Sequence, residues 1–193
     1  MAVRNLREGT VLKSKYRIGQ VLGFAGFGIT YLAINLELSQ TVVIKEYFPM
    51  DLAYRDAEKG EVSLTLPREK NDRKVYQKVK KDFLSEARRM SALSEVPSVV
   101  KVLDWFEENE TAYLVMEHVR GMGLDRYLER LDEPLSFQEA WKLMLPVLDG
   151  LEKVHNDLSD VPILRTKTTK GDLGVSLYSV AAQPEWDCQY EYD

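Results

Sequence analysis

The stretch Gly23-Phe24-Ala25-Gly26-Phe27-Gly28-Ile29-Thr30 decides how the first half of this chain is interpreted. Three glycines in six residues leave a tight turn without side chains, so backbone N–H groups can approach an anion such as a phosphate closely. A P-loop would end in Gly-Lys-Ser/Thr, and this sequence does not follow the glycines here. A dinucleotide-binding fingerprint would require the glycines to open a helix, but residues 29–34 have no helix cap. Residues 29–34 are β-branched and aromatic, which is typical of a strand. The stretch therefore predicts a strand–turn–strand lid over a phosphate group, although an ordinary β-turn also fits these residues.

Composition sets the broad class of the protein. The chain has 193 residues, of which 45% are hydrophobic and 30% charged, as in a soluble globular protein of one domain or one and a half. The net charge of −5 argues against non-specific binding to nucleic acid or a membrane surface, while a nucleotide site can still be locally basic. The single Cys188 provides neither a disulfide framework nor a zinc cluster. With no signal peptide and no membrane-span pattern, we expect a cytoplasmic protein.

The first part of the chain predicts an α+β layer. We expect residues 1–15 to be a leader, and a helix from Asn71 or Asp72 to about Leu93 with Phe83, Ala87, Met90 and Leu93 facing a core. The β-rich runs predict five antiparallel strands on one side of that helix. Their expected ranges are 16–22, 29–35, 41–47, 99–106 and 112–119, with a hairpin turn at Asn109-Glu110 and a short extra strand at 62–66.

From residue 124 the pattern becomes helical. Residues 124–131 predict a short helix, and Ser136 with Glu139 forms a capping box that opens a longer amphipathic helix. Pro146 should kink this helix. The periodicity fades after His155, and we expect weak order in residues 156–193.

Lys45 is the first candidate for chemistry, because it interrupts the apolar run Val42-Val43-Ile44. A buried lysine is costly unless it is paired or holds an anion, whereas a lysine pointing outward from an edge strand needs no partner. Glu86, between the core positions Phe83 and Ala87, is the candidate partner; taken alone, it also fits a surface carboxylate.

Several motifs in order resemble the protein-kinase superfamily. Residues 23–28 are similar to its glycine loop, Val42-Val43-Ile44-Lys45 to its Val-Ala-Ile-Lys strand, and residues 83–87 to its αC segment. Residues 114–119 are similar to the hinge between the lobes. Phe-Gly-Ile-Thr-Tyr at 27–31 and Ile-Lys-Glu-Tyr-Phe-Pro at 44–49 are closer still to bacterial Hanks-type serine/threonine kinases.

The resemblance implies a kinase-like fold and roles for particular residues. It implies a small lobe with hinge over residues 16–119, the start of a helical large lobe over 120–155, and binding of ATP and Mg²⁺. Lys45, fixed by Glu86, would hold the α- and β-phosphates. Met90 and Val102 would link the helix to the sheet. The other implied nucleotide contacts are Val21, Gly23, Gly26, Phe27, Gly28, Thr30, Val43, the gatekeeper Met116, and the backbone of Glu117 and Val119.

The sequence departs from the family pattern, most strongly in the large lobe. Ala25 replaces the second glycine, and Val43 replaces the usual alanine over the adenine. No intact His-Arg-Asp or Asp-Phe-Gly occurs. His155-Asn156-Asp157 is a partial match in which Asp157 would be the base, with Pro162 in place of the family's asparagine. Residues 150–155 are also similar to the end of the family's αE helix, a resemblance that would leave the catalytic loop deleted. Gly171-Asp172-Leu173-Gly174 is a second partial match in which Asp172 would reach magnesium.

Three interpretations remain open. The first is an ATP-dependent serine/threonine protein kinase that acts on protein hydroxyls and is weakly active or inactive as this chain stands. The second is a nucleotide-binding pseudokinase or partner-binding module, and the third is a truncated gene product. The expected partners are ATP and a protein substrate or regulatory protein.

Overall fold

A computed structural model describes residues 5–25, 28–55, 62–64 and 71–157 of the chain. The chain divides into two compact units, which we describe separately. The first contains the residues up to Ala92 together with Lys101–His118, and the second contains Leu93–Val100 and the chain from Val119 onward. Residues 93–100 thus group with the second unit.

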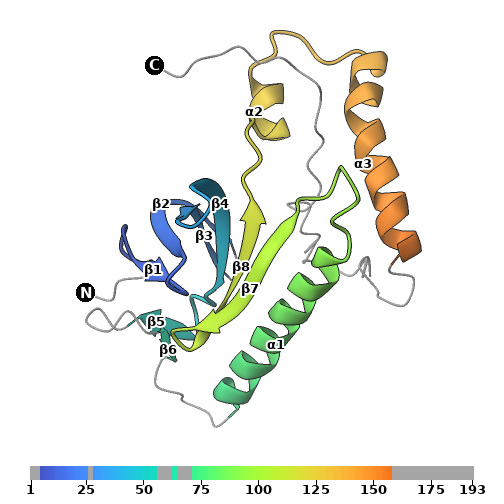
Figure 1. Cartoon of the computed structure of the whole chain (residues 1–193). Helices are drawn as coiled ribbons and strands as arrows, with labels where there is room; N and C mark the ends of the chain where they lie inside the picture. The colour runs from blue at the N-terminus through green and yellow to red at the C-terminus, as the bar shows by residue number, and fades with distance from the viewer. Residues whose placement is uncertain (1–4, 26–27, 56–61, 65–70, 158–193) are drawn as a thin grey trace. The chain divides into compact units, whose positions relative to one another are not determined.

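The first unit is built on an antiparallel sheet in the order β1-β2-β3-β4-β8-β7 (Figure 1). The predicted sheet with one helix is confirmed, but the sheet has six strands rather than five. Its strands are β1 Val11–Leu12, β2 Tyr16–Ala25, β3 Gly28–Asn35, β4 Gln40–Tyr47, β7 Val102–Glu108 and β8 Thr111–Glu117. The helix is α1 Asp72–Ser91, and a separate two-stranded sheet pairs β5 Ala53–Arg55 with β6 Val62–Leu64.

The sixth strand comes from the segment predicted as a leader. Lys13 and Ser14 have φ angles of 50° and 52°, and two successive positive φ values make a turn whose twist matches a β-hairpin. This turn folds β1 back on β2, so Leu6 and Leu12 become almost completely buried. Asn109 and Glu110 make a similar turn, with φ angles of 53° and 60°, between β7 and β8, which confirms the predicted hairpin.

Side chains join the two edges of the sheet, so that it curls. The Lys13 ammonium lies 2.9 Å from the Asp104 carboxylate in β7, and the Tyr16 hydroxyl donates to the same carboxylate at 3.0 Å. The Tyr16 and Phe106 rings stack with their centroids 5.9 Å apart. β1 and β7 are the outermost strands of the sheet, so these contacts bring its opposite edges together.

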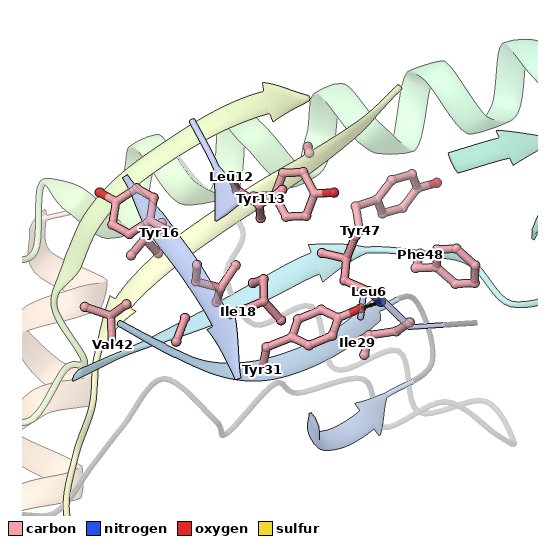
Figure 2. Close-up of a cluster of buried hydrophobic side chains, with 14 of the residues drawn as sticks. Leu6, Leu12, Tyr16, Ile18, Ile29, Tyr31, Val42, Tyr47, Phe48 and Tyr113 are labelled. Atoms are coloured by element: carbon pink, nitrogen blue, oxygen red, sulfur yellow. Dashed lines mark hydrogen bonds between the residues drawn. The ribbon is translucent and has the colours of Figure 1, made fainter. Parts of the chain in front are cut away.

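The curled sheet encloses the main hydrophobic core. Figure 2 shows that core side chains from β1, β2, β3 and β4 point toward one another, together with Tyr113 of β8. The labelled side chains are Leu6, Leu12, Tyr16, Ile18, Ile29, Tyr31, Val42, Tyr47, Phe48 and Tyr113.

Helix α1 packs against β7 and β8. Ala87 and Met90 are buried with Leu114 of β8, and Phe83, Val102, Trp105 and Met116 pack against this cluster. The predicted inward positions Phe83, Ala87 and Met90, and the link from Met90 to Val102, are therefore confirmed. The Lys80 ammonium adds an ion pair of 2.7 Å with Glu107 of β7. These contacts fix the helix on the sheet.

The second unit contains α2 Leu124–Glu129 and α3 Phe137–Asp157. The predicted capping box is confirmed, because the Ser136 N–H donates to the Glu139 carboxylate at 2.9 Å and the Glu139 N–H donates to Ser136 Oγ at 3.3 Å. Helix α3 continues through Pro146 as one element. Val154 is buried with Leu93, Val96 and Val99. In the part of the chain that the structure describes, no helix is long and apolar enough to cross a membrane.

Candidate functional site

The strand register brings the predicted phosphate-binding residues into one row. Gly23 of β2 pairs with Thr30 of β3, Thr30 pairs with Lys45 of β4, and Lys45 pairs with Leu114 of β8. Directly opposed residues in an antiparallel sheet project to the same face. The end of the glycine hairpin and Lys45 therefore share one face of the sheet.

An apolar row lies beside Lys45 on the same face. Val43 is two residues from Lys45, and it pairs with Leu32 on one side and Met116 on the other. All three side chains are only half-buried. A half-covered apolar surface next to a cation is the arrangement that a flat base carrying phosphates would fit.

Lys45 is half-buried, and its ammonium forms no ion pair with any carboxylate in the described residues. The predicted pair with Glu86 is therefore not formed in this structure. Glu86 lies on α1 but is exposed. It borders the inward face, whereas its neighbour Ala87 occupies the core position. Helical spacing placed Glu86 on the correct element but does not determine whether its side chain reaches the sheet.

Glu46, next to Lys45, projects to the opposite face and is completely buried. Its two carboxylate oxygens each accept a hydrogen bond of 2.7 Å from Arg55 Nη2. The Tyr31 hydroxyl donates to one oxygen at 2.8 Å, and the Tyr113 hydroxyl donates to the other at 3.0 Å. A buried carboxylate is tolerated only when it is paired and hydrogen-bonded in this way.

This cluster was not identified from the sequence. The available signal was strand alternation, since Glu46 follows Val42 and Ile44 at steps of two and must share their buried face. Burial, followed by the nearby Glu46 charge, raises the pKa of both Tyr31 and Tyr113 above the ordinary tyrosine value. Both hydroxyls are therefore protonated donors at neutral pH.

Arg55 connects the Glu46 cluster to β5. Its guanidinium is almost fully buried and also lies 5.3 Å from the centre of the Phe48 ring. The segment after β4 is thereby tied back onto the curled sheet before the chain continues toward α1. The strand that carries Lys45 is thus supported from the side opposite the candidate site.

The two described glycines of the loop have different surroundings. A Cβ atom on Gly28 would lie 2.5 Å from the Glu46 carbonyl oxygen, so close pairing of β3 with β4 itself requires glycine there. A Cβ atom on Gly23 would meet nothing within 4 Å in the described residues. Packing does not explain Gly23, whose predicted role is to leave space for phosphate. Gly26 and Phe27 lie outside the described residues.

A bulge in β2 changes which side chain faces the site. The register shifts between Val21, which pairs with Tyr31, and Gly23, which pairs with Thr30. Val21 is half-buried and packs against the main core, whereas Leu22 is 47% exposed. Leu22 is therefore a further candidate to cover the adenine base, the role that the family resemblance implied for Val21.

The hinge residues lie at the end of β8. The Glu117 N–H donates to the Lys101 carbonyl at 3.0 Å, and its carboxylate accepts from the Lys101 N–H at 2.9 Å. A base contact at Glu117 would therefore use its carbonyl oxygen. Met116 packs against the α1 cluster, and Val119 belongs to the second unit.

The predicted large-lobe residues are less fully described. Asp157 is the last residue of α3, and Asp172 lies outside the described residues together with the rest of 158–193. Among the residues that the structure covers, no group of three or more histidine, cysteine or acidic side chains could hold a metal ion.

Comparison with known proteins decides the family. The sequence model described as "Protein kinase domain" matches residues 16–159. The chain belongs to the protein kinase family. It is 26% identical over 164 residues to serine/threonine-protein kinase B of Synechocystis, covering 81% of this chain and 25% of that protein. It is 28% identical over 149 residues to serine/threonine-protein kinase PrkC of Bacillus subtilis, covering 77% of this chain and 19% of that protein.

A solved structure agrees with this family assignment. The chain of "PpkA-294 apo form" matches with a TM-score of 0.71 and 28% identity, covering 81% of this kinase chain and 53% of that chain. The kinase-like fold and the resemblance to bacterial serine/threonine kinases are thus confirmed. The chain spans a quarter or less of the two curated relatives named above and about half of the solved chain.

Proposed function

We propose that this kinase chain binds ATP with Mg²⁺ through its small lobe and transfers the γ-phosphoryl group to protein serine or threonine hydroxyls weakly or not at all. The observation that carries the binding proposal is the shared face of Gly23, Thr30 and Lys45. The half-buried Lys45 has no carboxylate partner among the described residues, so its ammonium is available to a phosphate as a point charge.

The apolar row supports the rest of the nucleotide. Val43 and Met116 lie beside Lys45 on that face, and we assign them to the adenine, with Leu22 as a further wall. Mg²⁺ would neutralise charge on the β- and γ-phosphates. Asp172 is the proposed metal ligand, and Asp157 the proposed base.

Two features support weak transfer by the chain as it stands. In protein kinases the strand lysine must be paired with the helix glutamate before transfer is efficient, and here Glu86 is exposed and does not reach Lys45. The sequence His155-Asn156-Asp157 also lacks the arginine of the family's catalytic loop, and Pro162 replaces its asparagine. We therefore favour nucleotide binding without efficient turnover.

Radiolabel transfer tests the catalytic part of this proposal. The chain is incubated with γ-labelled ATP, Mg²⁺ and a generic protein substrate, with Lys45→Met as the comparison. We expect incorporation at or only slightly above the level of the Lys45→Met variant. Robust incorporation that Lys45→Met abolishes would show an active kinase and overturn the proposal of weak transfer. Thermal denaturation with millimolar Mg-ATP tests binding separately, and we expect the melting temperature to rise.

A further inference from the structure

The outward side of α1 carries basic residues near both of its ends and along its first half. We define the basic stripe as Arg73, Lys74, Lys78, Lys81, Arg88 and Arg89, all of which are exposed. With 3.6 residues per turn, these six positions fall within an arc of roughly 160° that contains no acidic residue of the helix. The inward side of the helix holds Ala87 and Met90 against the sheet. The stripe therefore faces away from the sheet.

Contacts within the described part of the chain do not account for this stripe. None of its six side chains forms an ion pair with a described carboxylate, and Lys80, the paired lysine of α1, belongs to the inward side. Lys74 and Lys78 are four residues apart, and Lys78 and Lys81 are three apart, spacings at which like charges destabilise a helix. Arg88 and Arg89 favour the helix because they lie in its last turn. The three lysines have no such role.

The stripe also contrasts with the charge of the whole chain. Helix α1 contains seven basic and three acidic residues, while the chain carries a net charge of −5. A local field of opposite sign to the net charge steers a specific anionic partner without attracting polyanions in general.

We propose that the basic stripe of α1 is a docking surface for an acidic polypeptide segment. From Arg73 to Arg89 the stripe is roughly 24 Å long at 1.5 Å per residue, and it is one helix wide, which matches a helix or extended chain carrying glutamate or aspartate. The adjacent Asp82 and Glu86 form an acidic border that would repel a duplex broader than the stripe. The arc has no aromatic residue that could insert into a membrane surface or stack on the bases of a single-stranded nucleic acid.

This inference does not depend on nucleotide binding, and its test uses the full chain. A fluorescein-labelled peptide of about 16 glutamates, long enough to cover the stripe as a helix or as an extended chain, is titrated with protein and followed by fluorescence anisotropy. The variant Lys74→Gln, Lys78→Gln, Lys81→Gln, Arg88→Gln removes four charges from the stripe. Its control removes four exposed charges from α2 and α3 or their ends, with Arg126→Gln, Arg130→Gln, Lys142→Gln and Lys153→Gln.

We expect the wild type and the control to bind the peptide equally, and the stripe variant to bind about tenfold more weakly, since each exposed ion pair contributes little. Binding should weaken as salt is raised. Circular dichroism checks folding, and the double variant Lys78→Gln, Lys81→Gln replaces the quadruple one if that variant unfolds. Absence of peptide binding, or an equal loss in stripe and control variants, would overturn the proposal. So would tighter binding of duplex DNA or phosphatidylserine vesicles than of the peptide.

Discussion

Glu46 and Glu37 form ion pairs of almost equal length, but burial separates their contributions to stability. Glu46 lies 2.7 Å from Arg55 with both side chains buried, whereas Glu37 lies 2.8 Å from Lys15 and is largely exposed. Breaking a buried pair leaves an uncompensated charge in the core. We predict that Glu46→Gln lowers the free energy of unfolding by about 3–5 kcal/mol, measured by urea denaturation.

Glu37→Gln is the matched control for that measurement. Its pair is solvated, so the same change should cost less than about 1 kcal/mol. Equal effects of the two substitutions would mean that the buried cluster of Glu46, Arg55, Tyr31 and Tyr113 does not stabilise the fold as we describe.

Gly28 and Gly23 give a second test at the residue scale. A Cβ atom on Gly28 would collide with the Glu46 carbonyl oxygen, while one on Gly23 meets nothing described. We predict that Gly28→Ala lowers the free energy of unfolding by about 1–3 kcal/mol. Gly23→Ala should leave the urea midpoint unchanged but weaken ATP binding. A stable Gly28→Ala protein would contradict the close approach of β3 and β4.

The sequence singled out Lys45 because it interrupts an apolar strand, and the family resemblance implied Val43 and Met116 as its neighbours in the site. Their common face became visible only with the strand register. The choice between Val21 and Leu22 could not be predicted, since it depends on a bulge in β2 that leaves no sequence signal. The Lys45–Glu86 pair depends on where a whole helix sits relative to a sheet, which periodicity does not encode.

At the scale of elements, the capping box at the start of α3 gives a local prediction. Hydrogen bonds from the Ser136 side chain and backbone lower the pKa of Glu139 below its ordinary value. Ser136→Ala removes the side-chain bonds, so the Glu139 pKa should rise toward the ordinary glutamate value. NMR titration of the Glu139 carboxyl measures this shift. The helix should also lose about 1 kcal/mol of stability, and an unchanged pKa would show that the cap does not form in solution.

The elements that the sequence predicted well are the ones with long, regular patterns. The strands now labelled β2, β3 and β4, and helix α1, were expected within a few residues of their observed bounds. β1 and β5 were missed because they have two and three residues and neither lies in a longer alternating run. β6 is equally short, but it lies within the alternating run 62–66, where a short strand was expected. β5 is held by Arg55 of the buried cluster, a tertiary contact that no local pattern reveals.

At the scale of the first unit, its buried tyrosines predict sensitivity to alkali. Burial, followed by the neighbouring Tyr76, raises the pKa of Tyr47 to about 12 from 10.0. The pKa values of Tyr16, Tyr31 and Tyr113 are also raised. A tyrosine whose pKa is higher in the folded than in the unfolded state stabilises the fold fully when the pH is below the unfolded-state pKa of about 10. This contribution is lost as the pH rises from about 10 toward 12.

We therefore predict that the urea midpoint falls between about pH 10 and pH 12. Absorbance at 295 nm, which reports tyrosinate, should rise together with unfolding. Tyr47→Phe keeps the ring contacts and should reduce the alkaline loss. Full tyrosine ionisation in a protein that stays folded would contradict the burial described for these side chains.

The central claim at the scale of the molecule is that the face carrying Lys45 binds ATP. Isothermal titration with Mg-ATP tests it most directly, using wild type, Lys45→Met and the control Lys142→Met, which removes an exposed lysine of α3. We predict saturable binding by wild type and Lys142→Met, and binding at least about tenfold weaker for Lys45→Met because a charged contact to phosphate is lost. Absence of wild-type binding at millimolar ATP, or equal affinities in all three proteins, would contradict the account.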